Sequence, residues 1–270
     1  MVATEAFDDT GLPHTLEHLT FLGSKSYPYK GVLDNLASRS GADGTSAWTG
    51  VDHTAYAISC AGSEGLLRML PIFLDHILHP TLTQAGFVTE VYHVNGKGEE
   101  GGVVFAEMQG KEHTIERSLQ RELNREINPP GSAYRSVTGG LINEIRKLDI
   151  GRIREFHARY YKPWNICLHL DGDVPVEKLL NVFNNVIDPM ILDNMPSGAL
   201  PFPPLDWTRP FVETASALGP VIEEDKKRII RFAEDDESSG EAIMAWKGPR
   251  SGNYLEKLVS RRPWISLALR

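Results

Sequence analysis

The stretch of sequence that says most about the fold reads Gly11-Leu12-Pro13-His14-Thr15-Leu16-Glu17-His18-Leu19-Thr20-Phe21-Leu22-Gly23. Its leucines recur every three or four residues, which predicts an amphipathic helix that begins near Pro13 and ends by Gly23. Proline is well tolerated in the first turn of a helix, and Asp9 or Thr10 could cap it. We therefore expect a helix with one apolar face here.

Two imidazoles and one carboxylate share a face of this predicted helix. Positions i, i+3 and i+4 are neighbours on a helix, so His14, Glu17 and His18 project together. Two histidines four residues apart can bind one zinc ion through nitrogens at about 2.0–2.1 Å, and a spare carboxylate beside the metal can accept a proton from its water. The order His-x-x-Glu-His is the reverse of the commoner His-Glu-x-x-His motif. Taken alone, the segment could also be a helix with surface histidines.

A catalytic zinc site needs a third protein ligand, which must come from another part of the chain. We read residues 99–127 as one long helix, because apolar residues recur every four positions before Asn128-Pro129-Pro130-Gly131 ends it. A glutamate on such a helix could supply the ligand. For any single glutamate there, an exposed helical carboxylate is the alternative.

Together, these segments resemble the pitrilysin-type family of zinc peptidases, which includes insulin-degrading enzyme and presequence protease. Residues 11–24 are similar to the family's inverted zinc helix with its trailing Phe-x-Gly-Ser, and residues 100–108 are similar to its second helix. The resemblance implies that His14, His18 and Glu107 hold Zn²⁺ and that Glu17 is the general base. It also implies that Glu100 is a carboxylate that supports these ligands from outside.

The resemblance continues along the chain, from Val2 to about Gly248. Residues 134–140 resemble the family's glycine-rich loop, residues 156–166 its helix-to-strand junction, and residues 172–174 the turn after that strand. It implies that Ser46, Ala47 and Trp48 belong to an edge strand that holds the substrate backbone, with Ser46 where the family usually has Asn. Family enzymes are built from four such domains, or two pairs, and the second half is missing from this sequence.

For the fold we expect the α+β class, a mixed sheet packed by helices, in a truncated metallopeptidase domain of the pitrilysin-like type. Besides the elements above, the patterns predict helices over Gly31–Ser38, Glu64–Leu78 (kinked or divided at Pro71), Asp149–Tyr161 and Pro175–Ile187, a strand or hairpin over Ala47–Ser59, and a strand over Asn165–Asp171. We expect a zinc-binding peptidase domain over residues 1–188 and a proline-rich linker over 189–220. Residues 221–270 read as the start of an incomplete second domain, with strand-like pieces at Ile229–Phe232 and Ala242–Trp246.

Composition excludes several classes of function. The chain has 270 residues and a formal net charge of −8, which argues against a protein that binds the phosphate backbone of nucleic acid. Met1–Asp9 has neither a basic start nor an apolar segment of a secretory signal, and the longest apolar stretch, Leu66–Leu78, is too short to span a bilayer. No Cys-x-x-Cys pair exists. We expect a soluble intracellular protein without a membrane or nucleic-acid partner, cytoplasmic or, as the alternative, in the mitochondrial matrix.

The function that these features predict is zinc-dependent endopeptidase activity on peptides. In that mechanism zinc lowers the pKa of its water and polarises the scissile carbonyl, while Glu17 accepts the proton and passes it to the leaving amine. The alternative is a catalytically incompetent fragment or subunit that needs a complementary C-terminal half or second subunit. A metal-dependent hydrolase of non-peptide amides would use the same ligands.

Overall fold

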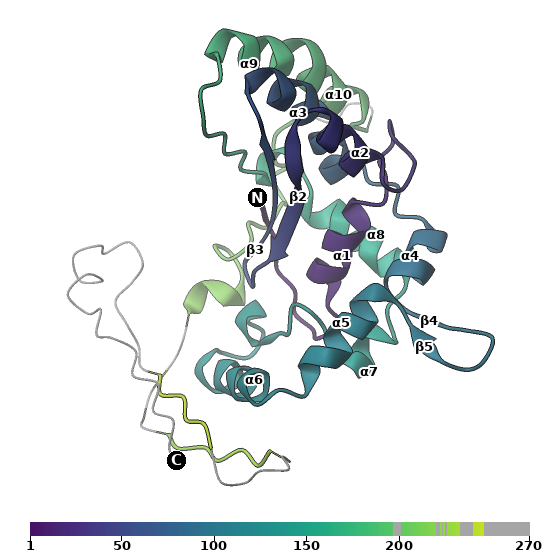
Figure 1. Ribbon diagram of the computed structural model, residues 1–270. Coiled ribbons are helices and arrows are strands. Elements are labelled where there is room, and N and C mark those ends of the chain that lie inside the picture. Colours follow the sequence, from purple (N-terminus) through teal and green to yellow (C-terminus); the bar gives the residue numbers. More distant parts are fainter. Residues whose placement is uncertain (197–200, 220–221, 223, 225, 233–239, 246–270) are drawn as a thin grey trace.

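The computed structural model describes residues 1–196, 201–219, 222, 224, 226–232 and 240–245 of the chain (Figure 1). Its strands are β1 (Val2–Ala3), β2 (Ala42–Thr49), β3 (His53–Cys60), β4 (His93–Val94) and β5 (Glu100–Gly101). Its α-helices are α1 (Leu12–Thr20), α2 (Val32–Arg39), α3 (Ser63–Leu78), α4 (Gln84–Glu90), α5 (Val103–Glu112), α6 (Ile115–Ile127), α7 (Ile142–Ile145), α8 (Ile150–Tyr160), α9 (Val176–Val182) and α10 (Asp188–Asp193). Short 3₁₀ turns occur at Ala133–Arg135, Pro163–Asn165 and Ala215–Leu218, and a π-helical turn at Phe183–Ile187 joins α9 to α10.

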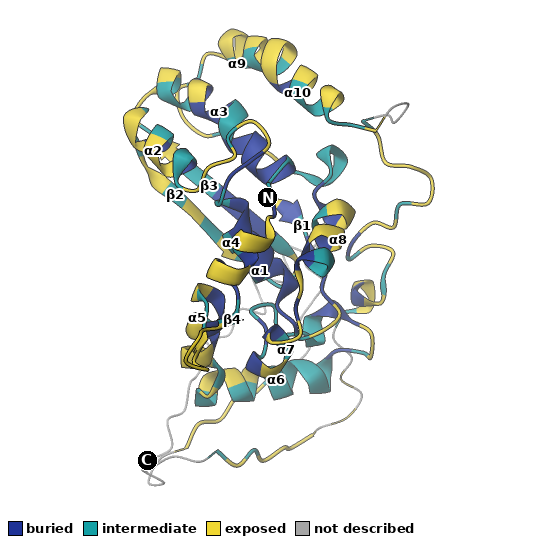
Figure 2. Cartoon of the chain, turned by 90° about the vertical axis from the view of Figure 1, so that its right-hand side faces the viewer, coloured by how far each residue is buried: buried dark blue, intermediate teal, exposed yellow. Residues whose placement is uncertain are grey.

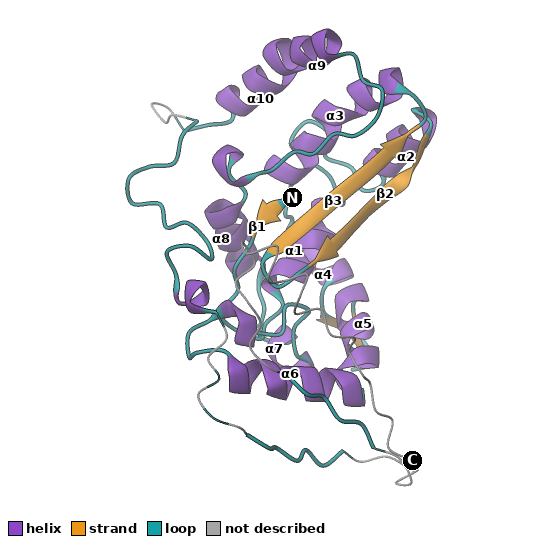
Figure 3. Ribbon diagram, turned by 90° about the vertical axis from the view of Figure 1, so that its left-hand side faces the viewer, coloured by secondary structure: helices purple, strands orange, loops and turns teal. Residues whose placement is uncertain are grey.

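The larger sheet is a hairpin with one short strand added to it. β2 and β3 pair antiparallel, with Thr49 opposite Thr54, and β1 pairs with the other side of β3 (Figure 3). The order β1-β3-β2 leaves β2 at the edge. The α+β class is therefore confirmed, but the described strands all pair antiparallel instead of forming the mixed sheet that we expected. A connection of three residues can only return the chain antiparallel.

Helix α1 lies in the middle of the domain, between the sheet and α8 (Figure 2). Leu12, Leu16 and Leu19 are buried in the main core cluster, where they meet apolar residues of α3, α5 and α8. Truncating a fully buried leucine costs about 2–5 kcal/mol, so the apolar face of α1 fixes the helix firmly in place. The opposite face is left for the polar residues.

The start of α1 is held by backbone contacts rather than by the side-chain cap that we predicted at Asp9 or Thr10. The N-cap is Gly11, whose φ of 77° favours glycine, and an added Cβ there would lie 2.6 Å from the carbonyl oxygen of Gly139. Asp9 instead accepts hydrogen bonds from the Val137 amide and the Arg125 guanidinium, both at 2.8 Å. The loop around Gly139 is thus fastened to the first turn of α1.

The long helix predicted over residues 99–127 is wrong. The chain forms β5, then α5, then α6, and the Thr114 side chain caps α6 by accepting a hydrogen bond from the Arg117 amide. Gly102 explains why α5 cannot begin earlier. Its φ is 127°, and an added Cβ would lie 2.2 Å from the Val91 carbonyl oxygen, so the backbone passes too close to another segment for a helical turn.

Two other predicted elements differ in detail. Helix α3 runs through Pro71 as a single helix, so of the two alternatives predicted at Pro71, a kink or a division, the division is wrong and the kink stays a prediction. The predicted strand Asn165–Asp171 is reduced to one bridge between Ile166 and Val2. Its apolar residues separate, because Ile166 packs against the main core and Leu170 against a second cluster formed by α3 and the helices around Ile187.

The described part of the proline-rich region folds back onto the domain. The Ser216 hydroxyl accepts a hydrogen bond from the Ala133 amide at 2.8 Å, and Trp207 packs edge-on against Trp164. Residues 229–232 and 242–245 form no strand, and Trp246 lies outside the described residues. The division at 188–189 and 220–221 stays a prediction. Within the described residues, no helix is both long enough and apolar enough to cross a membrane.

Candidate metal centre

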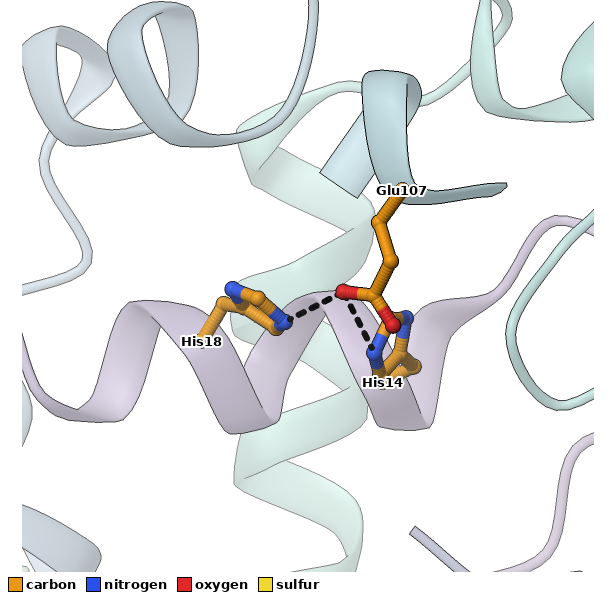
Figure 4. Close-up of side chains that lie close together, drawn as sticks. All are labelled: His14, His18 and Glu107. Carbon is orange, nitrogen blue, oxygen red and sulfur yellow. Dashed lines mark ion pairs between the residues drawn. The ribbon is translucent and has the colours of Figure 1, made fainter. Parts of the chain in front are cut away.

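Three polar side chains from two helices converge on one point (Figure 4). His14 and His18 lie on α1, and Glu107 reaches them from α5. Oε2 of Glu107 is 3.7 Å from Nε2 of His14 and 3.5 Å from Nε2 of His18. One ligand atom from each residue lies within 4.8 Å of the other two, and this is the one such group of three or more residues among those described. The two imidazoles are nearly perpendicular, at 82°.

The position of Glu107 follows from how α5 is anchored. Val104, Phe105 and Met108 are buried in the core, so Glu107 is left on the side that faces α1. The Met108 side chain also fills the space beside Gly139, where an added Cβ would lie 2.7 Å from its methyl carbon. Gly139 also lies beside the His14 ring, because an added Cβ there would be 4.0 Å from Nδ1 of His14.

The electrostatic surroundings keep His14 and Glu107 in the forms that bind a cation. Burial and the neighbouring His18 lower the pKa of His14 from 6.5 to about 4, so its imidazole is neutral at pH 7. Burial acts to raise the pKa of Glu107, but the Lys111 ammonium and the two histidines outweigh it and hold that pKa below its ordinary value. Lys111 Nζ lies 2.5 Å from the outer oxygen, Oε1, which leaves Oε2 turned toward the histidines.

Glu17 lies on the same helix face but outside this group of three. It is 9% exposed, and its Oε2 accepts a hydrogen bond from the hydroxyl of Thr49, the last residue of β2. Burial raises the pKa of Glu17, and the Thr49 hydrogen bond opposes that rise. A buried carboxylate with a raised pKa next to a candidate metal site has the properties of a proton acceptor.

The carboxylate beside His18 is Glu90, not Glu100. Oε1 of Glu90 lies 3.3 Å from Nδ1 of His18, and its Oε2 lies 3.4 Å from Lys30. Glu100 lies on β5, where it accepts hydrogen bonds from Arg146 and from Tyr92. Those partners lower the pKa of Glu100 to about 2. The supporting role that we predicted for Glu100 thus has no contact behind it within the described residues.

Two cavities flank Glu17 and His18, one on each side. The first cavity, about 340 Å³, is bounded by the candidate ligands, Glu17 and residues of β2, α5 and α6: Ala47, Trp48, Thr49, Met108, Lys111 and Arg117, with Thr138 and Gly139. The second cavity, about 360 Å³, is bounded by Glu17, His18, Phe21, Leu22, Lys30, Gly31, Asp34, Thr45, Ser46, Ala47 and Glu90. The predicted substrate-binding residues Ser46, Ala47 and Trp48 therefore border one or both cavities from the edge strand.

Sequence reasoning missed Glu90, Thr49 and Lys111. Lys111 stands four residues after Glu107, a spacing that places it on the same helix face and could have been noticed. Thr49 follows the predicted edge-strand residues directly. For Glu90 no local signal exists, because the β4–β5 hairpin separates it from α5 and only the folded chain brings it to His18.

Comparisons with known proteins identify the family to which the chain is similar. The family model described as Insulinase (Peptidase family M16) matches residues 3–123, and the model described as Peptidase M16 inactive domain matches residues 147–259. An uncharacterized protein of Schizosaccharomyces pombe is 41% identical over 92% of this chain and 23% of its own length. An uncharacterized protein of Saccharomyces cerevisiae is 42% identical over 96% of this chain and 24% of its own.

A named peptidase and a solved structure also match. The mitochondrial presequence protease of Drosophila melanogaster is 32% identical over 77% of this chain and 21% of its own length. The crystal structure of a protease from Helicobacter pylori shares the fold, with a TM-score of 0.58, 23% identity, and coverage of 74% of this chain and 45% of that one. The chain thus spans about a quarter of the length of the curated relatives that it matches.

Proposed function

Since this chain belongs to the M16 family of peptidases, we propose that it is the metal-binding part of a zinc-dependent endopeptidase. His14, His18 and Glu107 are the proposed ligands of Zn²⁺, and Glu17 is the proposed proton acceptor. The observation that supports this most strongly is the convergence of two imidazole nitrogens on one carboxylate oxygen at 3.5 and 3.7 Å.

The spacing of these atoms fits a zinc ion better than it fits direct hydrogen bonds. Two ligands bound at about 2.1 Å to one tetrahedral ion lie roughly 3.4 Å apart. An N–H···O hydrogen bond would instead bring the atoms to about 2.9 Å. Two histidines and one glutamate also match the ligand set of catalytic zinc sites, which leave the fourth position open. Because His14 is neutral at pH 7, a cation would not have to displace a proton from it.

The chemistry assigned to this chain centres on Glu17. A zinc ion held by the three ligands would supply Lewis acidity toward the carbonyl of the scissile peptide bond. Glu17 would accept the proton of the attacking water and deliver it to the leaving amine. The Thr49 hydroxyl occupies Oε2 of Glu17, so Oε1 is the oxygen left for the proton.

We further propose that a peptide substrate lies along β2. The strand is at the edge of its sheet and borders both cavities, so its unpaired backbone groups can bind an extended peptide as an additional strand. Ser46, Ala47 and Trp48 would form that contact, with Ser46 supplying a hydroxyl for hydrogen bonding. The binding mode follows from the free strand edge and does not depend on a particular substrate sequence.

Replacing Glu17 by Gln tests the proposal. Glu17→Gln should bind zinc as the parent protein does, measured by metal analysis after dialysis, and should lose hydrolysis of a quenched fluorescent peptide. Glu155→Gln, on the exposed face of α8, is the matched control and should keep both properties. If Glu17→Gln cleaves the peptide at the parental rate, the role given to Glu17 is wrong.

A second candidate function is a unit that holds the fold and the metal site but needs a complementary part for catalysis. The observation that favours it is coverage, because the chain matches about a quarter of each curated relative. Peptide cleavage assayed with and without the remaining part of a full-length relative separates the two, and activity of the 270-residue chain alone would exclude the second.

We also propose a cytoplasmic location for the protein, with the mitochondrial matrix as the alternative.

A further inference from the structure

The two cavities beside the candidate metal centre differ in charge. In the first cavity, the charged side chains other than Glu17 and the candidate ligand Glu107 are Lys111 and Arg117, and both are positive. In the second cavity, Asp34 and Glu90 are negative, and Lys30 is the single cation. A peptide that extends through both cavities therefore meets two cations beyond the candidate metal centre at one end and a surplus of carboxylates at the other.

The two cations of the first cavity are not equally engaged. Lys111 reaches the outer oxygen of Glu107, whereas the guanidinium of Arg117 forms no ion pair or hydrogen bond within the described part of the chain. Arg117 lies on the first turn of α6, after the Thr114 cap, and is exposed. A free guanidinium at the wall of a cavity can bind a carboxylate with two parallel hydrogen bonds.

The cation of the second cavity is already paired. Lys30 lies 3.4 Å from Glu90, and Asp34 accepts a hydrogen bond from the Thr45 hydroxyl at 2.7 Å. Phe21 and Leu22 add apolar surface. This cavity therefore offers no free positive charge to an acidic group, and an acidic residue of a substrate would be repelled there.

Strand β2 connects the two cavities. Thr45, Ser46 and Ala47 border the second cavity, and Ala47, Trp48 and Thr49 border the first. Because β2 is an edge strand, a peptide paired with it would run past Ala47 from one cavity to the other. The position of a residue along a bound peptide therefore decides which cavity its side chain enters and which charges surround it.

We propose that the first cavity is a binding subsite for a carboxylate of the substrate, with Arg117 as its specificity-determining residue, Lys111 as a second cation and Trp48 as an apolar wall. The inference rests on the proposed function, because it assumes that a peptide lies along β2. It adds the substrate class: peptides with an acidic residue, or their own C-terminal carboxylate, on the α5–α6 side of the cleavage point.

The test uses binding, so that turnover does not obscure it. The zinc-loaded Glu17→Gln chain is titrated with fluorescent eight-residue peptides with amidated C-termini, in which Glu, Gln or Lys is moved through each position. At one position, we expect the peptide with Glu to bind about tenfold more tightly than the peptide with Gln, which is the size expected for a hydrogen-bonded pair of charged groups. We expect this preference to weaken as the salt concentration is raised. Gln-only peptides with a free C-terminus, shortened stepwise, distinguish a terminal carboxylate from a side chain.

Two further variants locate the effect. Arg117→Glu should reverse the preference, so that the Lys peptide binds more tightly than the Glu peptide at that position. Arg39→Glu makes the same change of net charge on the exposed side of α2, outside both cavities, and should leave the preference intact. If the two variants weaken the Glu preference equally, the effect is long-range charge and the subsite is wrong.

The remaining outcomes separate this inference from the proposed function. Cleavage by the chain with Glu17 intact, but without any preference for a carboxylate in either series of peptides, overturns the subsite and leaves the peptidase assignment standing. Absence of both binding and cleavage for every peptide overturns the two together.

Discussion

Two groups of histidine and carboxylate side chains in this chain differ in how completely their polar atoms are paired. Asp75 of α3 is buried and accepts hydrogen bonds from the Ser24 hydroxyl at 2.6 Å, the Ser26 amide at 3.0 Å and the His79 ring at 2.9 Å. At the candidate metal centre, His14 and His18 instead lie 3.7 and 3.5 Å from the Glu107 oxygen.

The difference separates a structural cluster from a ligand site. A paired buried carboxylate stabilises the fold, because every donor around it is used. Groups that converge without bonding to each other leave lone pairs available for a cation. Mutations in the Asp75 cluster should therefore lower the stability of the fold, whereas mutations at the candidate metal centre should lower its affinity for metal.

The largest expected effect is on metal affinity. His14→Ala removes one of three proposed ligands and should weaken zinc binding by more than about 100-fold, since removing even an outer partner of a ligand costs roughly 10–100-fold. His79→Ala should leave zinc affinity unchanged. Competition with a chromogenic chelator measures both, and equal losses in the two variants would remove the distinction between the clusters.

The next effect is on stability. Asp75→Ala leaves the Ser24 hydroxyl, the Ser26 amide and the His79 ring without their acceptor and should lower the free energy of unfolding by about 3 kcal/mol. Asp171→Ala, at an exposed position, should change it by less than about 0.5 kcal/mol. Urea unfolding of the metal-free protein gives both values. A loss for Asp75→Ala no greater than that of the control would mean that the cluster is not structural.

A smaller effect should separate Glu90 from Glu100. Glu90→Gln weakens the carboxylate contact that orients the His18 ring and should lower zinc affinity by roughly 10–100-fold. Glu100→Gln should leave it unchanged, because Glu100 is paired with Arg146 and Tyr92 instead. Competition with the chromogenic chelator measures both affinities. If Glu100→Gln weakened zinc binding and Glu90→Gln did not, the supporting role would belong to Glu100, as first expected.

Helix α1 and Glu107 show where sequence reasoning succeeds, and Glu100 and Glu90 show where it stops. Helix α1 could be predicted because its information is local: leucines on one face, polar groups on the other, and Gly23 just beyond the end. Glu107 was found through the resemblance of its segment to a known family. The histidines of α1 and Glu107 of α5 lie on regular helices, and the periodicity of a helix sets which residues share a face.

Glu100 was misplaced because its position depends on a contact between distant segments. The backbone at Gly102 passes against the Val91 carbonyl, which starts α5 late and puts Glu100 on a strand. Glu90 ends a short helix before that hairpin, so its approach to His18 is fixed only by the tertiary fold. The edge position of β2 was expected only from the family resemblance. The charge of the two cavities is invisible in local sequence, because the cavities combine residues 30–49 with residues 90–117.

The smallest expected effect is on the stability of the fold at acid pH, and it concerns His157, a histidine that is hydrogen-bonded like His79 of the Asp75 cluster. Nε2 of His157 donates a hydrogen bond to the Ile77 carbonyl at 3.0 Å, and burial lowers the pKa of His157 to about 4 from 6.5. The unfolded chain binds a proton near pH 6.5, whereas the folded chain binds it only near pH 4. The contribution of His157 to stability is therefore complete above pH 6.5 and is lost as the pH falls from 6.5 to 4.

Allowing for the partial exposure of His157, this loss amounts to about 1–2 kcal/mol. His157→Gln can keep the hydrogen bond but cannot titrate, so unfolding of the metal-free variant should depend less on pH between 6.5 and 4 than unfolding of the parent. Both proteins are measured in chelator, because bound metal would stabilise the native state over the same range. Equal slopes would assign the acid sensitivity to another buried histidine. His14, whose pKa is also about 4, would then be the first to test, and the unpaired site would limit acid stability in place of the paired one.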